Sequence, residues 1–154
     1  MLNTTANETR PQFLEGSRGR LFCVEFPAPS ARNTGAAVLV VPPIGEEMNK
    51  CRRMLTLAAR ACQAAGLTAL ITDLYGTGDS AGDFRDGTVV QWRDDLHASM
   101  SHLLSGGAKT LPAAWSGKRM RSIHQTGYAG FHDWGYEYVR CNGSAGRSEK
   151  AIFG

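Results

Sequence analysis

The pentapeptide GDSAG at residues 78–82 sets a serine beside an aspartate and between two glycines. It matches the G-x-S-x-G pattern, in which a serine hydroxyl stands exposed on a sharp turn between a strand and a helix and attacks a carbonyl carbon. Ser80 is therefore the first candidate nucleophile. It lies, however, seven positions after Asp73, inside a loop that runs on to Gly87. An elbow needs its serine directly between strand and helix, so we expect Ser80 to be a loop residue and assign no catalytic residue.

The same loop also fits the dinucleotide fingerprint G-x-G-x-x-A at residues 76–81. That fingerprint works only where a helix begins within the glycines, so that its N-terminal dipole meets the pyrophosphate. No helix is predicted there, and Asp79 and Asp83 would repel the anion. We therefore predict no nucleotide site and no cofactor.

Histidine and cysteine spacing gives no metal pattern. His97 and His102 lie five positions apart, which is roughly 140° around a helix, so they do not form the adjacent pair that a helical metal site uses. We expect both to be surface residues. Downstream candidates at irregular spacing are His124, His132, Asp133 and Cys141. The four cysteines form no C-x-x-C pair, and no metal is predicted.

The sequence predicts a strand, a helix and a second strand that together position the loop containing Ser80. Residues 36–41 (AAVLVV) and 67–73 (LTALITD) are short apolar runs typical of strands buried in a mostly parallel sheet. Between them apolar residues recur every three or four positions, which predicts one helix face. Glu46 and Glu47 suit the start of that helix and Gly66 its end. The expected face is Met48, Cys51, Leu55, Ala58, Cys62 and Ala65.

A hairpin and a second helix flank this unit. Residues 13–16 and 19–26 are predicted to pair through a tight turn. Thr88 and Gln91 form a capping-box pair that begins a helix, in which Asp94 and Asp95 are expected to be exposed charges beside a buried tryptophan. The predicted buried face of this helix is Val89, Trp92, Leu96, Met100 and Leu103.

Three blocks carry a resemblance to a known family: PPIGEEMNKCRRM at residues 42–54, TDLYGTGDSAGDF at 72–84 and QWRDDL at 91–96. In this order and spacing they resemble the α/β-hydrolase superfamily and, within it, the exosortase A system-associated hydrolases of the second type. The resemblance covers residues 13–104. It implies a three-layer α/β sheet and serine-type hydrolysis of an ester, thioester or amide. It also implies a small-molecule or acyl substrate and a link to exopolysaccharide and protein-sorting gene clusters.

The resemblance also implies where an oxyanion hole would form. In this superfamily the turn after the first central strand supplies one backbone N–H to the oxyanion. The matching candidates are Ile44, Gly45 and Glu46, although the turn departs from the common His-Gly form. The alternative is that the prolines and glycine at residues 42–45 only shape the turn. The triad nucleophile, acid and histidine would follow residue 104, where no matching elbow is found.

Residues 105–154 differ in character from the rest. They contain 9 of the 18 glycines and show neither alternation nor a helical stripe, so we expect an irregular, loosely ordered tail. We interpret it as truncated or frame-shifted near Leu104. Two hypotheses follow: a hydrolase that is catalytically incomplete, or a noncatalytic binding or scaffold module. In either, the unfinished sheet would leave an exposed edge that invites self-association.

Composition bounds the remaining possibilities. The 154 residues, 42% hydrophobic and 20% charged, suit one globular domain. No apolar run is long enough to span a membrane and residues 1–10 do not form a secretory signal, so we expect a cytoplasmic protein. Residues 1–104 hold 10 Lys/Arg against 11 Asp/Glu, and the remainder 7 against 3. Seven scattered positive charges do not predict nucleic-acid binding.

Overall fold

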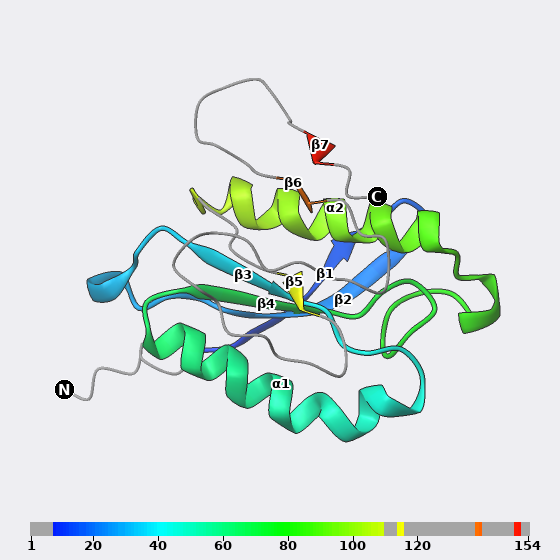
Figure 1. Cartoon of the computed structure of the whole chain (residues 1–154), viewed down its shortest axis with the longest axis horizontal. Helices are drawn as coiled ribbons and strands as arrows, with labels where there is room; N and C mark the ends of the chain where they lie inside the picture. Colours follow the sequence, from blue (N-terminus) through cyan, green and yellow to red (C-terminus); the bar gives the residue numbers. More distant parts are fainter. Residues whose placement is uncertain (1–7, 110–113, 116–137, 140–149, 152–154) are drawn as a thin grey trace.

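The computed structural model describes residues 8–109 and three two-residue strands farther along the chain (Figure 1). In chain order the elements are β1 (Arg10–Glu15), β2 (Arg20–Phe26), β3 (Ala37–Val40), α1 (Glu46–Ala64), β4 (Thr68–Thr72), α2 (Val89–Ser105), β5 (Ala114–Trp115), β6 (Tyr138–Val139) and β7 (Lys150–Ala151). Two single-turn 3-10 helices, Ser30–Arg32 and Phe84–Asp86, lie in the loops.

Five of the strands form one sheet in the order β1-β2-β4-β3-β5. The first three in this order are antiparallel neighbours, whereas β3 runs parallel to β4 and to β5. Helix α1 covers one face and α2 the other (Figure 1). This is the three-layer α/β arrangement expected from the sequence, with the two central strands connected through α1. Strands β6 and β7 pair with each other in a separate ribbon.

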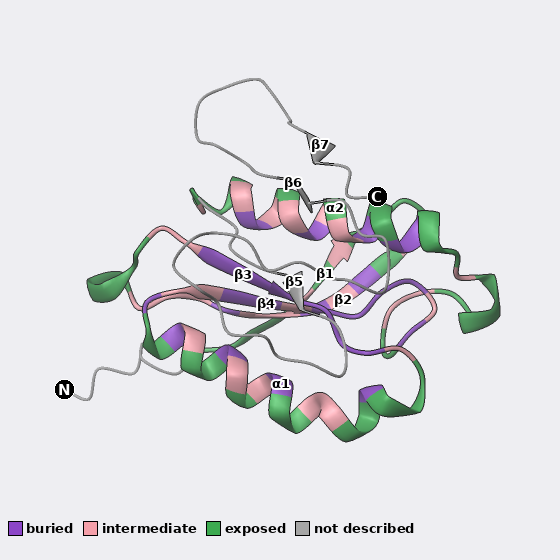
Figure 2. Ribbon diagram, viewed as in Figure 1, coloured by how far each residue is buried: buried purple, intermediate pink, exposed green. Residues whose placement is uncertain are grey.

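The core is divided by the alternation of side chains along the strands. Ala37, Leu39 and Val41 face α2, where they pack with Trp92 and Leu103. The intervening residues of β3, Val38 and Val40, face α1 and pack with Leu55. All four residues of β3 are buried, as expected for a strand covered on both faces (Figure 2).

Helix α1 is found where it was predicted, but its buried face differs at two positions. Met48 and Leu55 are buried as expected, but Ala59 rather than Ala58 completes the buried face, and Gln63 joins it. Gln63 is 1% exposed, and its side-chain amide donates to the carbonyl oxygens of Glu8 at 2.8 Å and Pro27 at 3.0 Å. A polar side chain is therefore buried because it fastens two loop carbonyls to the helix.

Helix α2 corrects two of the expectations. The Thr88 hydroxyl caps it by accepting from the N–H of Gln91 at 3.2 Å, as predicted, but Val89 is 58% exposed and Asp95 is fully buried. The buried face turns toward Gln91, Asp95 and Ser99. The reason is the loop after β4: Asp95 accepts the N–H of Tyr75 at 2.8 Å, so it satisfies a backbone group that no strand neighbour reaches.

The hairpin and the sheet edge also differ from expectation. Strand β1 begins at Arg10 and pairs along its whole length with β2, so the hairpin is longer than predicted. The short strand β5 was not predicted, and it pairs with Leu39 and Val40 of β3.

Most of residues 105–154 lie outside the described residues, and the loose order that the sequence predicts for this tail stays a prediction. No described helix is long and apolar enough to cross a membrane.

Replacing Asp95 should change how stability depends on pH. Burial raises the pKa of Asp95 above its usual 3.8, although the hydrogen bonds from Tyr75 and Gln91 lower it in part. Asp95 therefore contributes most to the free energy of unfolding at pH values below its pKa in the unfolded chain. This contribution is lost as pH rises through its pKa in the folded protein. The Asp95→Asn variant does not titrate there, so its unfolding free energy relative to the wild type should increase from about pH 3 to about pH 7.

Urea unfolding at several pH values measures this difference. The matched control is Asp86→Asn, at an exposed carboxylate, which should show no comparable rise. If the unfolding free energy of Asp95→Asn relative to the wild type falls or stays constant over this range, burial does not raise the pKa of Asp95 in the folded protein.

Candidate functional site

The candidate site lies where β3 and β4 end. Because these strands are parallel, their carboxyl ends meet at one edge of the sheet, where the crevices of open α/β sheets bind ligands. Residues 41–45 lead from β3 into α1, and residues 73–88 lead from β4 into α2. Both connections therefore converge on the same edge (Figure 1).

The turn after β3 holds the three oxyanion candidates. Ile44 is partly buried and packs against the core on the α2 side. Gly45 precedes α1 with φ 77° and has open space where a side chain would stand. Glu46 is the first residue of α1. The first N–H groups of a helix have no partner within it, so this turn can offer backbone donors at the edge of the sheet. The oxyanion role stays a prediction.

Asp73 organises the loop after β4. Its carboxylate is 2% exposed and accepts from Arg52 of α1 at 3.0 Å. The same oxygen accepts the N–H of Asp79 at 3.1 Å. Gly78 fits between them with φ 52°, and a Cβ there would lie 1.9 Å from that oxygen. The contribution of Arg52 was missed in the sequence, although its position next to the buried helix face and the aspartate at the strand end were both visible.

Ser80 makes two hydrogen bonds inside this loop. Its hydroxyl donates to the carbonyl oxygen of Asp73 at 2.6 Å and accepts the N–H of Phe22 at 2.8 Å. Within residues 8–109, no serine hydroxyl is hydrogen-bonded to a histidine ring. The local bonding expected of Asp73 and Ser80 is therefore present. That Ser80 is not a nucleophile stays a prediction.

The glycines of the loop fold it onto Tyr75 rather than opening a helix. Gly82 packs so closely against the ring of Tyr75 that a Cβ would lie 2.2 Å from it. The first helical turn after the glycines is Phe84–Asp86, which the Asp83 side chain caps by accepting the N–H of Arg85 at 3.1 Å. The loop thus lacks the glycine-to-helix geometry by which the dinucleotide fingerprint binds pyrophosphate.

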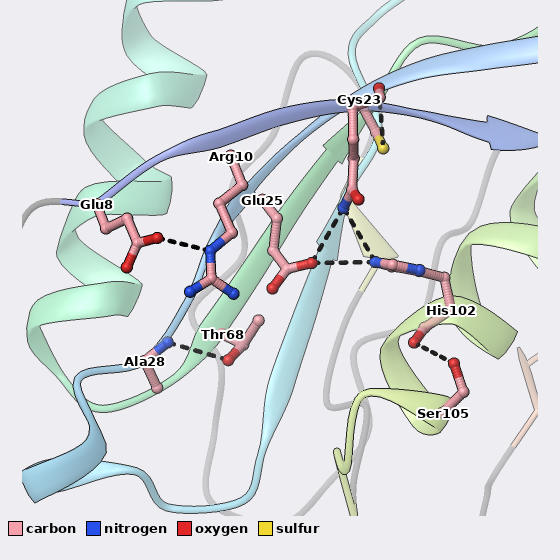
Figure 3. Close-up of polar contacts among 9 residues, drawn as sticks. Glu8, Arg10, Cys23, Glu25, Ala28, Thr68, His102 and Ser105 are labelled. Atoms are coloured by element: carbon pink, nitrogen blue, oxygen red, sulfur yellow. Dashed lines mark hydrogen bonds and ion pairs between the residues drawn. The ribbon is translucent and has the colours of Figure 1, made fainter. Parts of the chain in front are cut away.

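His102 differs from its expected place on the surface. It is partly buried at the sheet face of α2, where its Nε2 lies 3.0 Å from Glu25 and 3.1 Å from the Gln12 amide (Figure 3). Glu25 pairs with Leu70 in the middle of β4, whereas Ser80 is bonded at the end of that strand. The His102 and Glu25 pair therefore joins the hairpin to α2. His97 is exposed as expected.

The buried thiol beside this pair is not a reactive one. Burial, followed by the charges of Glu25 and Asp73, raises the pKa of Cys23 to about 12. Its thiol donates to the carbonyl oxygen of Gln12 at 3.6 Å (Figure 3). A thiol is nucleophilic as the thiolate, so Cys23 acts as a small core residue. In the described part of the chain, no three His, Cys, Asp or Glu side chains are grouped to hold a metal ion.

Comparison with solved structures identifies the fold. An α/β serine hydrolase without a lid from Xanthomonas campestris matches with a TM-score of 0.57 and 26% identity over 71% of this chain. An α/β serine hydrolase homologue from Coxiella burnetii matches with a TM-score of 0.55 and 20% identity over 70%. The α/β hydrolase GrgF from Penicillium sp. sh18 gives 0.57 and 21% over 71%. The chain has an α/β-hydrolase fold.

This fold is present in part. The chain covers 49% of the Xanthomonas structure, 50% of the Coxiella structure and 37% of GrgF, so it spans half or less of their lengths. The sequence matches no protein-family model, and a search of curated proteins found none similar to it. Within the α/β-hydrolase fold, the edge formed by the turn at residues 41–45 and the Asp73 loop is the region that would contribute to an active site.

The Asp73 loop should be sensitive to the side-chain volume at Gly78. In the Gly78→Ala variant the new methyl group would collide with the Asp73 carboxylate and with Arg52, because a Cβ would lie within 3.0 Å of both. We expect a loss of at least about 2 kcal/mol in the free energy of unfolding, measured by urea denaturation. The matched control is Gly107→Ala.

Gly107 also has positive φ, at 96°, but open space around it. Its replacement should cost only the backbone term, about 1–2 kcal/mol. Equal losses for the two variants would show that the contacts of Gly78 with Asp73 and Arg52 contribute nothing beyond backbone strain.

Proposed function

We propose that this chain carries the oxyanion side of a serine-type hydrolase that acts on an ester, thioester or amide, and that the chain itself is catalytically incomplete. The observation that carries the first part is the position of Ile44, Gly45 and Glu46. They form the turn at the carboxyl end of β3 in a chain with an α/β-hydrolase fold. That is where this fold draws an oxyanion donor.

The second part rests on the bonding of Ser80. A nucleophilic serine gives its proton to a base in the reaction, so its hydroxyl must face that base. The Ser80 hydroxyl instead donates to the backbone of Asp73. This bond secures the loop, and it supports the proposal that Ser80 is not a nucleophile.

Ser116 is a second serine to be tested as a nucleophile. It directly follows β5, which lies beside β3 in the sheet, and a nucleophile elbow directly follows a strand. The local sequence AWSGK departs from G-x-S-x-G at both glycine positions. Ser116 itself lies outside the described residues, so its role depends on the labelling experiment below.

A noncatalytic binding or scaffold module is the second candidate function. The same two hydrogen bonds of Ser80 favour it, because a locally bonded serine stabilises a loop without any reaction. In this case the far edge of β3, of which β5 pairs only Leu39 and Val40, would bind a partner strand or a second copy of the chain. A small-molecule ligand is compatible with either function.

The finer assignments rest on the sequence: the first on its resemblance to a known family, and the other two on composition and patterning. We propose a place among exosortase-associated hydrolases, a cytoplasmic location, and a frame-shifted or truncated segment after Leu104. Translation of the coding DNA downstream of the Leu104 codon in its other frames tests the last of these. A strand followed by a serine elbow in another frame would support it, and its absence from every frame would refute it.

A fluorophosphonate probe tests whether the chain is catalytic. The 154-residue chain, its Ser80→Ala variant and its Ser116→Ala variant are incubated with the probe and analysed by mass spectrometry. We expect no labelling of any of the three, and no p-nitrophenyl ester hydrolysis above background. Labelling that is lost in one variant would identify that serine as the nucleophile and overturn the noncatalytic assignment.

Ser80→Ala also has an expected effect on stability. It removes the acceptor of the partly buried Phe22 N–H, and loss of such a hydrogen bond costs about 1 kcal/mol. Ser101→Ala, at an exposed position of α2, is the control and should change the free energy of unfolding by less than about 0.5 kcal/mol. A Ser80→Ala protein as stable as the control would mean that the loop does not depend on this hydroxyl.

A further inference from the structure

A groove with a volume of about 220 Å³ lies between α1 and the sheet, on the face opposite α2. Its floor is apolar and is formed by Val24, Phe26 and Ile71. One wall belongs to α1 and consists of Arg52, Thr56 and Arg60. Sites for drug-sized ligands begin at roughly 300 Å³, so this groove suits a short apolar chain or a single ring.

The apolar floor continues across the hairpin. Side chains alternate between the two faces of a strand, so Phe22 lies on the same face as Val24. Phe22 is paired in register with Phe13 of β1. The two rings are in edge contact with centroids 5.5 Å apart, and Phe13 is 50% exposed. The groove therefore opens onto an exposed apolar strip.

Positive charge borders this apolar surface. Arg60 is exposed and makes no hydrogen bond or ion pair with any residue that the structure describes. Arg52 uses one nitrogen to bind Asp73, and a guanidinium carries five N–H donors, so others remain available. The guanidinium of Arg20 lies 5.0 Å from the Phe13 ring centroid. Among the described residues, those that line the groove include no acidic side chain.

We propose that this groove binds a free carboxylate with a short apolar tail. The tail lies on Val24, Phe26 and Ile71, where it is removed from water. The carboxylate accepts from the Arg60 guanidinium, which has no competing anion among the described residues. Arginine suits this role because its planar fork matches the two oxygens of a carboxylate.

Charge and shape together favour this ligand over a membrane surface. Adsorption to an anionic bilayer needs several positive charges, each contributing about 1 kcal/mol. Here Arg52 is matched by Asp73, which leaves Arg60 as the one uncompensated charge among the described residues that line the groove. The proposal does not depend on hydrolase activity, because the groove lies on the α1 face of the sheet, so a failure of either proposal leaves the other standing.

Octanoate is the probe, and octan-1-ol, which has the same tail without the charge, is the ligand control. Both are titrated into the 154-residue chain while the methyl resonances of Val24, Leu55 and Ile71 are followed by NMR. Arg60→Gln removes the charge, and Arg93→Gln, at an exposed position of α2, is the matched control. Thr56→Phe fills the groove and leaves both arginines in place.

Octanoate should shift the methyl groups of the groove, and octan-1-ol should bind about tenfold more weakly, as expected for loss of one charged hydrogen bond. Arg60→Gln should weaken octanoate binding by a similar factor, Arg93→Gln should leave it unchanged, and Thr56→Phe should abolish it. Equal binding of octanoate and octan-1-ol, unchanged binding by Arg60→Gln, or shifts confined to other methyl groups would overturn the proposal. So would cosedimentation with phosphatidylglycerol vesicles without octanoate binding, which would assign the surface to a membrane.

Discussion

The buried carboxylate of Asp73 is the interaction on which the candidate site depends. A carboxylate that is 2% exposed must be paired and hydrogen-bonded, and this one takes both a guanidinium from α1 and a backbone N–H from its own loop. The backbone of Asp73 is also hydrogen-bonded: its N–H donates to the carbonyl oxygen of Phe22 at 2.9 Å, and its carbonyl oxygen accepts from the Ser80 hydroxyl. One residue therefore joins the end of β4 to α1, to β2 and to the glycine-rich loop. A side chain at position 78 would collide with the Asp73 carboxylate, so the network requires a glycine there.

The same network explains why a G-x-S-x-G sequence here differs from a nucleophile elbow. An elbow holds its serine with strain and leaves the hydroxyl exposed, whereas this loop holds its serine by the hydroxyl itself. Both bonds of Ser80 go to backbone atoms on neighbouring strands, so a base would have to break them before it could take the proton. The serine and the aspartate are both hydrogen-bonded within this region, whereas the proposed oxyanion donors belong to a different segment, the turn before α1.

Much of this arrangement was predictable because it depends on local patterns. The Val-rich run of β3, the three-and-four spacing of α1 and the threonine cap of α2 each predict an element from its own residues. The sequence did not predict contacts between distant residues. Asp95 was expected on the surface because nothing in its neighbourhood shows that the N–H of Tyr75 needs an acceptor. Likewise, His102 finds Glu25 and Gln12 only after the hairpin folds onto α2. The two residues of β5 are too few to give a pattern.

The two faces of the sheet reach stability by different means. On the α1 face the helix packs chiefly through apolar residues such as Leu55 and Ala59, and two polar side chains, Arg52 and Gln63, attach it to the strand-end loops. On the α2 face, polar side chains of the helix reach backbone atoms of the loop after β4: Trp92 donates to the carbonyl of Tyr75 at 3.0 Å, and Asp95 accepts from the N–H of the same residue. The hydrophobic effect is non-directional, whereas a pair of opposed hydrogen bonds to one residue fixes both distance and direction. The loop at the candidate site is therefore held at Tyr75 by α2 and at Asp73 by α1, whose Arg52 neutralises the Asp73 carboxylate.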